Sequence, residues 1–451
     1  MMDRELTDTE RYPTLSEHGR RMLDRLLQHP HAPVYRNRAG SRLTADDLAR
    51  VRAFDAEAGH APIGWRANAK PAWLGDYVAQ CFADVPWFRA RGTPPARFED
   101  VPQVSRADFA GDIARFVPDS VELDRLINFH TSGATGHPLL IPSHPVVAAS
   151  YIAFHKRALR RFGIEPKAAR GTVGIVLLGH QQQCFTYVSV IPAMDEAGYA
   201  KINLHPNDWR NADDRAPYLD ALQAEIYSGD PISFAALLDL PVRHQPRALV
   251  STSMTLQPAL RAELEARFAC PVLDVYSMNE AGPLAVFDAD AGGHVLLQHR
   301  VYVEILDDAG NALPPGAHGE ITLTGGFNFC LPLLRYRTGD YASLEMNGTE
   351  PVLKNFSGRP PVRFRAASGA WINNNELTHA LRKLALRQYR VHQDAAGAVR
   401  VDYDAAVLLE SELTSVLRVW FGAETAITVA KTTFDAAKAV QYSSDLPGAQ
   451  G

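Results

Sequence analysis

One segment at the end of the first third of the chain has the residue types of an anion-binding loop. Residues 131–138 read TSGATGHP and follow the strand-like LINFH. Glycine lets backbone N–H groups turn toward an anion, and hydroxyl groups donate hydrogen bonds to its oxygens. The segment is not a Walker loop, since G-x-x-x-x-G-K-[ST] does not occur in the sequence. It predicts a polyphosphate site, with a polar surface turn as the alternative, and the residues that would form the site are Thr131, Ser132, Gly133, Thr135 and Gly136.

Three downstream segments carry further aromatic, acidic and basic residues. They are Tyr276–Glu280 (YSMNE), Arg335–Asp340 (RYRTGD) and Gly358–Arg359. Together with residues 131–138, this order resembles the motifs of the acyl-adenylate-forming (AMP-binding) superfamily, which includes acyl-CoA synthetases, nonribosomal-peptide adenylation domains and luciferases. The length, the short carboxyl-terminal part and the spelling PLLRYRTGD are most similar to phenylacetate-CoA ligase.

The resemblance implies a role for each of these residues. The ring of Tyr276 would lie against adenine, and Glu280 would hold Mg²⁺, a hard cation that prefers oxygen ligands. Asn279 stands where the family has Thr, so its amide would contact the α-phosphate. Asp340 would accept hydrogen bonds from both ribose hydroxyls. Arg359 would reach a phosphate or the ribose as a catalytic residue, together with Glu280.

A catalytic lysine is expected near the end of the chain, where the family carries one in a loop of its small domain. Lys438 is the candidate, and Lys431 competes with it. An ammonium there would neutralise charge that develops on the α-phosphate and on leaving pyrophosphate. Residues 369–377 resemble the segment that lines the family's thiol tunnel, which favours CoA as co-substrate. Pro360 and Pro361 replace the usual hinge Asp, so another acceptor stays open.

The acid pocket is predicted from position in the chain. The expected pocket residues are Phe185, Tyr187, Ser251, Ser253 and Met278. Aromatic walls favour a planar aryl acid, with core residues of a helix as the alternative for Phe185 and Tyr187.

The cysteines do not suggest a disulfide framework or a zinc module. The four cysteines lie far apart and include no C-x-x-C pair. His180 and Cys184 have helical i, i+4 spacing, but no further matching metal ligands accompany them.

These residues need a layered fold to bring them together. Strand-like and helix-like segments alternate from about residue 128 to 278, which predicts an α/β domain with ligand loops at the carboxyl ends of its strands. Strand-rich sequence after Glu280 predicts an antiparallel extension. From Val362 the order is β-α-β-β-α-β. We therefore expect a large layered α/β adenylating domain over 1–357 and a small, mobile C-terminal domain over 358–451.

Composition excludes several classes of protein. The 451 residues are 46% hydrophobic and 22% charged, which is typical of a folded globular protein. The net charge of −5 argues against nucleic acid as a partner. The polar amino terminus and the lack of an apolar run of about 18 residues predict a cytoplasmic protein without membrane contact. A homodimer stays open.

The expected function is an AMP-forming ligase that uses ATP and Mg²⁺ to convert a carboxylic acid, preferably aromatic, to acyl-AMP and then to its CoA thioester. One alternative is transfer to an amine, a carrier-protein thiol or another small nucleophile, or activation of an oxyanion that is not a carboxylate. The other is a nucleotide-binding protein without turnover.

Overall fold

A 13-stranded mixed sheet organises the large part of the computed structural model. The strand order is β12-β13-β14-β15-β11-β10-β9-β8-β7-β4-β6-β5. The thirteenth strand, β1, is outside this order and pairs with β14 in the parallel sense. The structure describes residues 5–66, 69–130, 139–181, 184–357, 362–373, 377, 380–381, 383–434 and 441–449.

The predicted α/β alternation forms the parallel half of this sheet. Strands β6, β4, β7, β8 and β9 are parallel neighbours, and β5 closes the edge in the antiparallel sense. β5 and β7 were not predicted. The bounds are β4 (Val173–Gly179), β5 (Tyr187–Ile191), β6 (Ala197–Asn203), β7 (Ile226–Gly229), β8 (Ala248–Thr252) and β9 (Val272–Met278).

Antiparallel strands extend the sheet beyond β9, as the strand-rich sequence after Glu280 predicts. The extension buries Tyr336 and Leu323 in one core with the amino-terminal Phe88 and Phe109. Its strands are β1 (Val104–Ser105), β10 (Gly282–Asp288), β11 (Gly293–Leu296), β12 (Val301–Leu306), β13 (His318–Gly325), β14 (Leu333–Asn347) and β15 (Glu350–Ser357).

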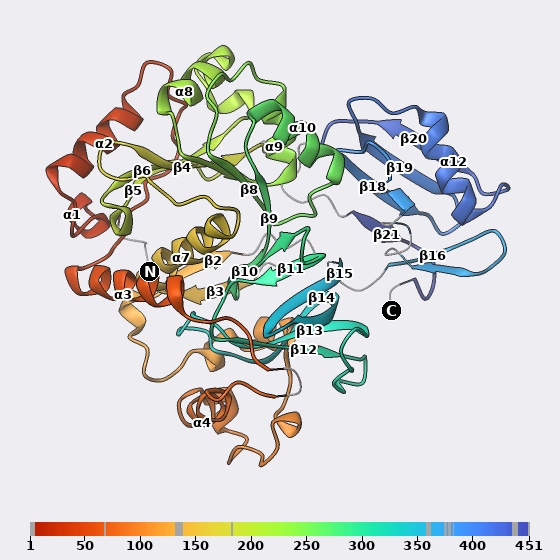
Figure 1. The fold of residues 1–451 in the computed structure, drawn as a ribbon, viewed down its shortest axis with the longest axis horizontal. Helices are drawn as coiled ribbons and strands as arrows, with labels where there is room; N and C mark the ends of the chain where they lie inside the picture. The colour runs from red at the N-terminus through yellow and green to blue at the C-terminus, as the bar shows by residue number, and fades with distance from the viewer. Residues whose placement is uncertain are drawn as a thin grey trace.

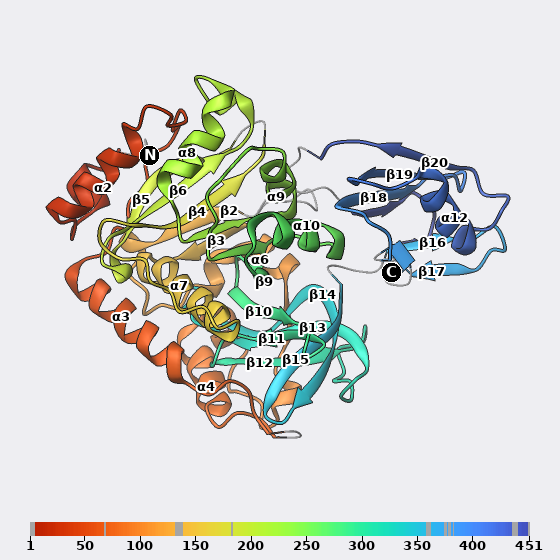
Figure 2. The ribbon, with the colours of Figure 1, turned by 45° about the horizontal axis from the view of Figure 1, so that its top comes forward.

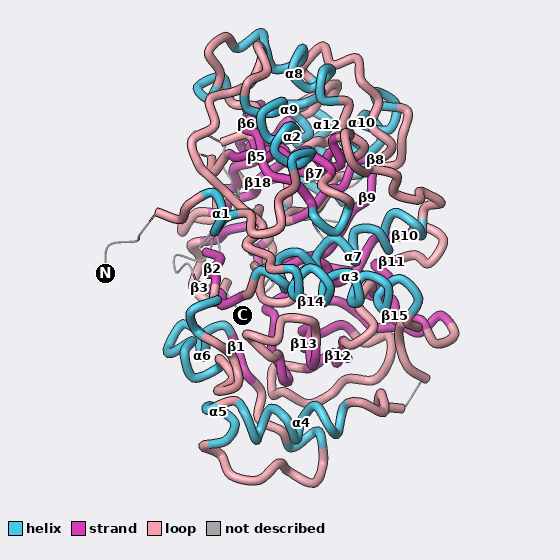
Figure 3. Tube along the Cα trace, turned by 90° about the vertical axis from the view of Figure 1, so that its left-hand side faces the viewer, coloured by secondary structure: helices cyan, strands magenta, loops and turns pink. Residues whose placement is uncertain are grey.

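Helices cover both faces of the parallel half (Figures 1 and 2). Four helices pack on one face through a core that includes Leu26, Leu219, Phe234 and Leu260: α2 (Glu17–Leu27), α8 (Arg215–Leu222), α9 (Pro231–Leu238) and α10 (Pro258–Phe268). On the other face α7 (Pro145–Arg161) packs against β7, β8 and β9, and α3 (Ala45–His60) lies behind it (Figure 3). The sheet is therefore the middle layer of three.

The remaining amino-terminal elements surround the extension. The helices are α1 (Asp8–Arg11), α4 (Leu74–Asp84), α5 (Pro86–Arg89) and α6 (Arg106–Asp112). Ser105 is the N-cap of α6, and its N–H donates to the Asp108 carboxylate at 2.8 Å, which fixes the start of the helix next to Arg106. β2 (Ile127–His130) and β3 (Leu140–Ser143) form a separate antiparallel pair.

The C-terminal elements form sheets and a core of their own. A four-stranded sheet has the order β20-β19-β18-β21, β16 pairs with β17, and Leu413, Leu417 and Phe421 of α12 pack into this core. Six of the thirteen residues of the helix predicted over 374–386 lie outside the described residues; Leu377, Ala380 and Leu381 are helical, but residues 383–386 form a turn and loop, so the predicted end of the helix was wrong. β17 and β21 were not predicted. The elements are β16 (Arg363–Arg365), β17 (Trp371–Asn373), β18 (Gln388–Gln393), β19 (Val399–Asp404), α12 (Glu410–Phe421), β20 (Ile427–Lys431) and β21 (Tyr442–Ser444).

This small C-terminal domain stands to one side of the molecule, next to α10 (Figure 2). Arg387, one residue before β18, donates through Nε to the Glu263 carboxylate of α10 at 2.8 Å. The domain boundary at residue 358 stays a prediction, since residues 358–361 are outside the described part. None of the described helices combines the length and the hydropathy needed to cross a membrane.

Candidate active site

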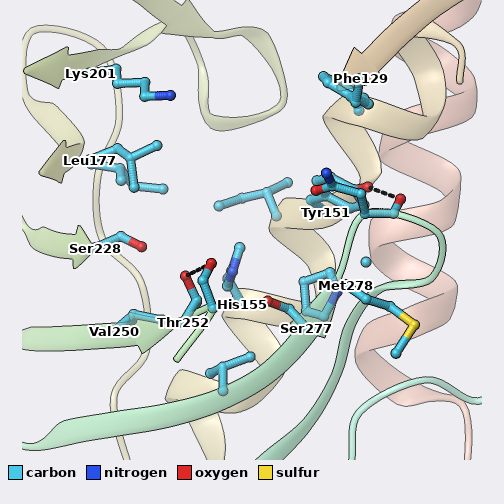
Figure 4. Close-up of a pocket in the computed structure, with 18 of the residues that line it drawn as sticks. Phe129, Tyr151, His155, Leu177, Lys201, Ser228, Val250, Thr252, Ser277 and Met278 are labelled. Carbon is cyan, nitrogen blue, oxygen red and sulfur yellow. Dashed lines mark hydrogen bonds between the residues drawn. The ribbon is translucent and has the colours of Figure 1, made fainter. Parts of the chain in front are cut away.

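A large cavity lies between α7 and the parallel half of the sheet (Figure 4). Its volume is about 1880 Å³, above the roughly 300–1000 Å³ of ordinary ligand pockets, so it can take a nucleotide together with a second substrate. Strand ends of the large sheet and residues of the C-terminal domain, including Tyr389 and Tyr442, both line it.

Tyr276 and Asp340 meet in this cavity from opposite halves of the large sheet. The Tyr276 hydroxyl of β9 donates to Asp340 Oδ2 of β14 at 2.7 Å. Burial, and then the neighbouring Asp340, raises the pKa of Tyr276 well above its usual 10, so its hydroxyl keeps the proton. The Tyr276 ring lies 4.5 Å from the ring of Phe356, measured between centroids. Gly339 takes φ +75°, a conformation that suits glycine, where the chain turns to present Asp340.

Glu280 is a buried carboxylate that lines the cavity in the turn between β9 and β10. It is 4% exposed. Its Oε1 accepts from Arg106 Nη1 of α6 at 3.0 Å and from the Tyr336 hydroxyl at 3.2 Å. The Tyr336 ring stacks on Phe109 of α6, which ties the same helix to β14. A guanidinium and a phenol therefore fix one carboxylate oxygen, and no described residue bonds the other.

The end of β9 brings Met278 and Asn279 to the cavity wall. Met278 is half-buried and Asn279 is exposed, and both residues are among those that line the cavity. The Tyr151 hydroxyl of α7 donates to the Asn279 carbonyl at 3.4 Å. Tyr151 can lie so close to this turn because Gly282 has no side chain, since a Cβ there would come within 2.6 Å of the Tyr151 ring. Burial raises the pKa of Tyr151 to about 12.

Of the other expected acid-pocket residues, Phe185, Tyr187 and Ser253 line the cavity and Ser251 does not. Phe185 is 53% exposed and its ring centroid lies 5.5 Å from that of Tyr187, the first residue of β5. The alternative that both are helical core residues is therefore wrong. Ser253 lines the cavity with φ +72°, a strained conformation for serine. Ser251 is fully buried on the opposite face of β8, because side chains alternate along a strand, and Thr252 lines the cavity instead.

His155 of α7 points into the same space. It lines the cavity together with Thr252 and Ser277, which Figure 4 also labels. Burial lowers the pKa of His155 from 6.5 to about 4. The cavity wall is therefore uncharged at this position at neutral pH.

Some expected residues fall outside the described part of the chain. These are Thr131, Ser132, Gly133, Thr135, Gly136, Arg359 and Lys438. The flanks of the loop are described: β2 ends at His130 and β3 begins at Leu140, directly opposite each other in the register. Lys431, the competing lysine, is exposed at the end of β20 and is not among the residues that line the cavity.

Several cavity residues were not identified from the sequence. Arg106, Tyr151, His155 and Tyr336 come from three separate elements, and only Tyr336 belongs to a recognised motif, RYRTGD. Thr252 lies between Ser251 and Ser253, the two residues that were expected in the pocket. A zinc site is not supported by the described residues, since no three His, Cys, Asp or Glu side chains among them are placed to share a metal ion.

Comparison with solved structures shows the fold. The 2-hydroxyisobutyryl-CoA ligase, solved in the postadenylation state in complex with R3-HIB-AMP, superposes with a TM-score of 0.60 at 16% identity, over 88% of this chain and 89% of the ligase. The same ligase with 2-HIB-AMP gives the same values. The prediction of a large layered α/β domain with an antiparallel extension and a small C-terminal domain is thereby confirmed.

Sequence comparison gives more distant curated relatives and a family. Protein CapK of Staphylococcus aureus is 21% identical over 304 residues, which make up 64% of this chain and 64% of CapK. Phenylacetate-coenzyme A ligase of Escherichia coli K12 is 32% identical over 108 residues, 22% of this chain and 24% of the ligase. The chain thus spans less than two thirds of the relatives it matches. A family model described as AMP-binding enzyme matches residues 99–329, just over half of the chain. The chain belongs to the AMP-binding enzyme family.

Proposed function

We propose that this protein is an AMP-forming ligase that activates a carboxylic acid with ATP and passes the acyl group to CoA. An acid oxygen attacks the α-phosphorus, the bond between that phosphorus and the bridging oxygen breaks, and pyrophosphate leaves. The CoA sulfur then attacks the acyl carbonyl, the thiol proton goes to solvent, and AMP leaves. Both steps depend mainly on positioning and on charge stabilisation.

One observation carries the proposal. Tyr276 and Glu280, at the end of β9 and in the turn after it, line a single cavity with Asp340, which lies 60 residues further along the chain. An aromatic ring, a buried carboxylate and a half-buried carboxylate suit adenine, a metal and a ribose respectively. Membership of the AMP-binding family and the fold shared with an acyl-CoA ligase support the same assignment.

Glu280 fits a Mg²⁺ ligand. Its Oε1 is held by Arg106 and Tyr336, so the carboxylate is oriented and its second oxygen can bind a cation. Protein Mg²⁺ sites commonly use one or two carboxylates and complete their ligands with phosphate and water. When bound, the ion would neutralise charge on the phosphates.

The other residues divide the remaining tasks. Asp340 is placed to accept from ribose hydroxyls, in competition with the Tyr276 hydroxyl that it now accepts from. The loop 131–136 would bind the phosphates. Lys438 and Arg359, in the segment 358–451 that we assign to a mobile domain, would stabilise the charge on the α-phosphate as pyrophosphate leaves. The C-terminal residues in the cavity lining, such as Tyr389, are consistent with a site completed by that domain.

The acid is proposed to be aromatic or at least elongated and largely apolar. Tyr151, Tyr187 and Phe185 supply ring surfaces along the cavity between α7 and the sheet. Rings of this kind stack on or pack edge to face against an aryl group.

Acid-dependent exchange of labelled pyrophosphate into ATP tests adenylation. We expect exchange with at least one aryl or long-chain acid, and acceleration of AMP release by CoA. Nucleotide binding without exchange over a broad acid panel would contradict the proposal and favour a binding protein. Exchange with hydroxamate formation but without a CoA effect would contradict CoA as the acceptor and favour an amine or a carrier thiol.

A further inference from the structure

A lysine interrupts the apolar face of the sheet at the end of the cavity remote from β9. Lys201 lies on β6, is half-buried and lines the cavity. Its register neighbours on β5 and β4 are Tyr187 and Leu177, and Leu177 is followed across the sheet by Ser228 and Val250. All five side chains in this row line the cavity, and Figure 4 shows the Lys201 ammonium pointing from β6 into it.

The Lys201 ammonium has no anionic partner among the described residues. The acidic side chains that line the cavity contact other groups instead, namely Glu225 with Arg247, Asp274 with His294, Glu280 with Arg106, Asp340 with Tyr276, and Asp445 with His392.

The nearby Cys184 thiol does not supply a charge either. Burial raises the pKa of Cys184, although Lys201 lowers it in part, so the thiol is protonated at neutral pH. A partly buried ammonium without a counter-ion is costly unless a ligand provides one.

We propose that Lys201 binds a second carboxylate of the substrate, and that the acid activated here is therefore an elongated dicarboxylic acid. The inference rests on the proposed acid activation and defines its substrate class. An ammonium–carboxylate contact is charge-assisted and is stronger than a contact between neutral groups. The side chains of Leu177 on β4 and Val250 on β8, which lie between the two ends, would pack against the middle of the acid.

The position of Lys201 sets a lower limit on the length of such an acid. The reacting carboxylate must lie near the end of β9, beside Asn279 and Glu280. β6 is four strand spacings from β9 in the sheet, which is roughly 19 Å between the strands. The lysine stem covers part of this distance, so the two carboxylates need an aromatic ring or a chain of several methylene groups between them.

Matched acid pairs and a neutral variant test the proposal. Pyrophosphate exchange is measured with 4-methylphenylacetate against 4-carboxyphenylacetate and with octanoate against octanedioate. In the wild type we expect the diacid of the preferred pair to have the higher kcat/KM. Lys201→Met should lower kcat/KM for the diacid by about 10- to 100-fold and leave the monoacid unchanged or improved. Lys201→Arg should retain the preference, and Lys167→Met, at an exposed position, should behave as the wild type.

Calorimetric titration of the same acids in the presence of a non-hydrolysable ATP analogue separates this proposal from the function itself. If the diacid binds in a way that depends on Lys201 but supports no pyrophosphate exchange, the carboxylate site at Lys201 is upheld and acid activation is refuted. Exchange in which a monoacid is preferred, or in which Lys201→Met leaves the ratio of diacid to monoacid unchanged, would refute the subsite and leave acid activation standing. Absence of both binding and exchange with every acid would refute both.

Discussion

Replacement of Glu280 by Gln removes one negative charge from the cavity and keeps the side-chain shape. If Glu280 is a metal ligand, the loss of charge weakens Mg²⁺ binding beside the phosphates. We expect the Mg²⁺ concentration at half-maximal exchange to rise about 10- to 100-fold, with a lower rate at saturation. Arg106 loses its counter-ion but its side chain is 29% exposed, so water compensates in part and the free energy of unfolding should fall by only about 1–2 kcal/mol.

Glu304 offers a matched control outside the cavity. Its carboxylate pairs with Arg335 at 3.2 Å, and the side chains are 6% and 2% exposed. Burial raises the pKa of Glu304, which offsets part of the attraction to Arg335. Glu304→Gln should still lower the free energy of unfolding by about 2–3 kcal/mol, because the buried guanidinium stays charged.

The two variants should therefore separate metal binding from stability. Urea unfolding measures the free energy, and pyrophosphate exchange over a range of MgCl₂ concentrations measures the metal dependence. Glu280→Gln should change mainly the metal dependence, and Glu304→Gln mainly the stability. Wild-type Mg²⁺ dependence in Glu280→Gln, or an equal shift in Glu304→Gln, would refute the role we assign to Glu280.

Two more predictions concern the cavity walls. Burial lowers the pKa of His155 to about 4. Below pH 6.5 the unfolded chain therefore binds a proton at this residue and the folded chain does not. The free energy of unfolding should decrease as the pH is lowered from 6.5 toward 4. His155→Phe should abolish about 2 kcal/mol of the loss between pH 6.5 and 5 in urea unfolding, and identical pH profiles would contradict this. Asp340→Asn should raise the KM for ATP about 10-fold or more, since an amide oxygen accepts less strongly, while Tyr276→Phe should change it less. Equal effects would contradict a ribose contact at Asp340.

The residues that we propose for the nucleotide could be identified because most of them lie close together in the sequence, and their role stays a prediction. Tyr276, Met278, Asn279 and Glu280 occupy one strand end and the turn after it, so a short motif contains them all. Asp340 follows Gly339 in a second short motif. The layered fold was predictable for a similar reason, since alternating apolar segments between residues 128 and 278 define its strands and helices.

The acid end that we propose was predictable only in part. Phe185, Tyr187 and Ser253 were expected from their positions and line the cavity, whereas the row with Lys201 depends on the register of strands that are distant in the sequence. The strands β5 and β7 are short and were not predicted from the sequence. Without them, the side chains that lie beside Lys201 across the sheet could not be predicted. Ser251 illustrates the same limit: a one-residue difference along β8 places it on the opposite face from Val250 and Thr252. One signal was present in the sequence, namely a lysine between apolar residues in AKINLH.

The residues proposed for the nucleotide and those proposed for the acid lie on different elements, so each set can be substituted without changing the other. The groups around Glu280 and Asp340 lie on α6, β9, β14 and the turns beside the two strands, whereas the row with Lys201 crosses β5, β6, β4, β7 and β8. No residue belongs to both sets. Substitutions that are far apart and share no partner usually have independent effects. Lys201→Met should therefore change the choice of acid and leave the Mg²⁺ dependence of exchange as in the wild type, while Glu280→Gln does the reverse.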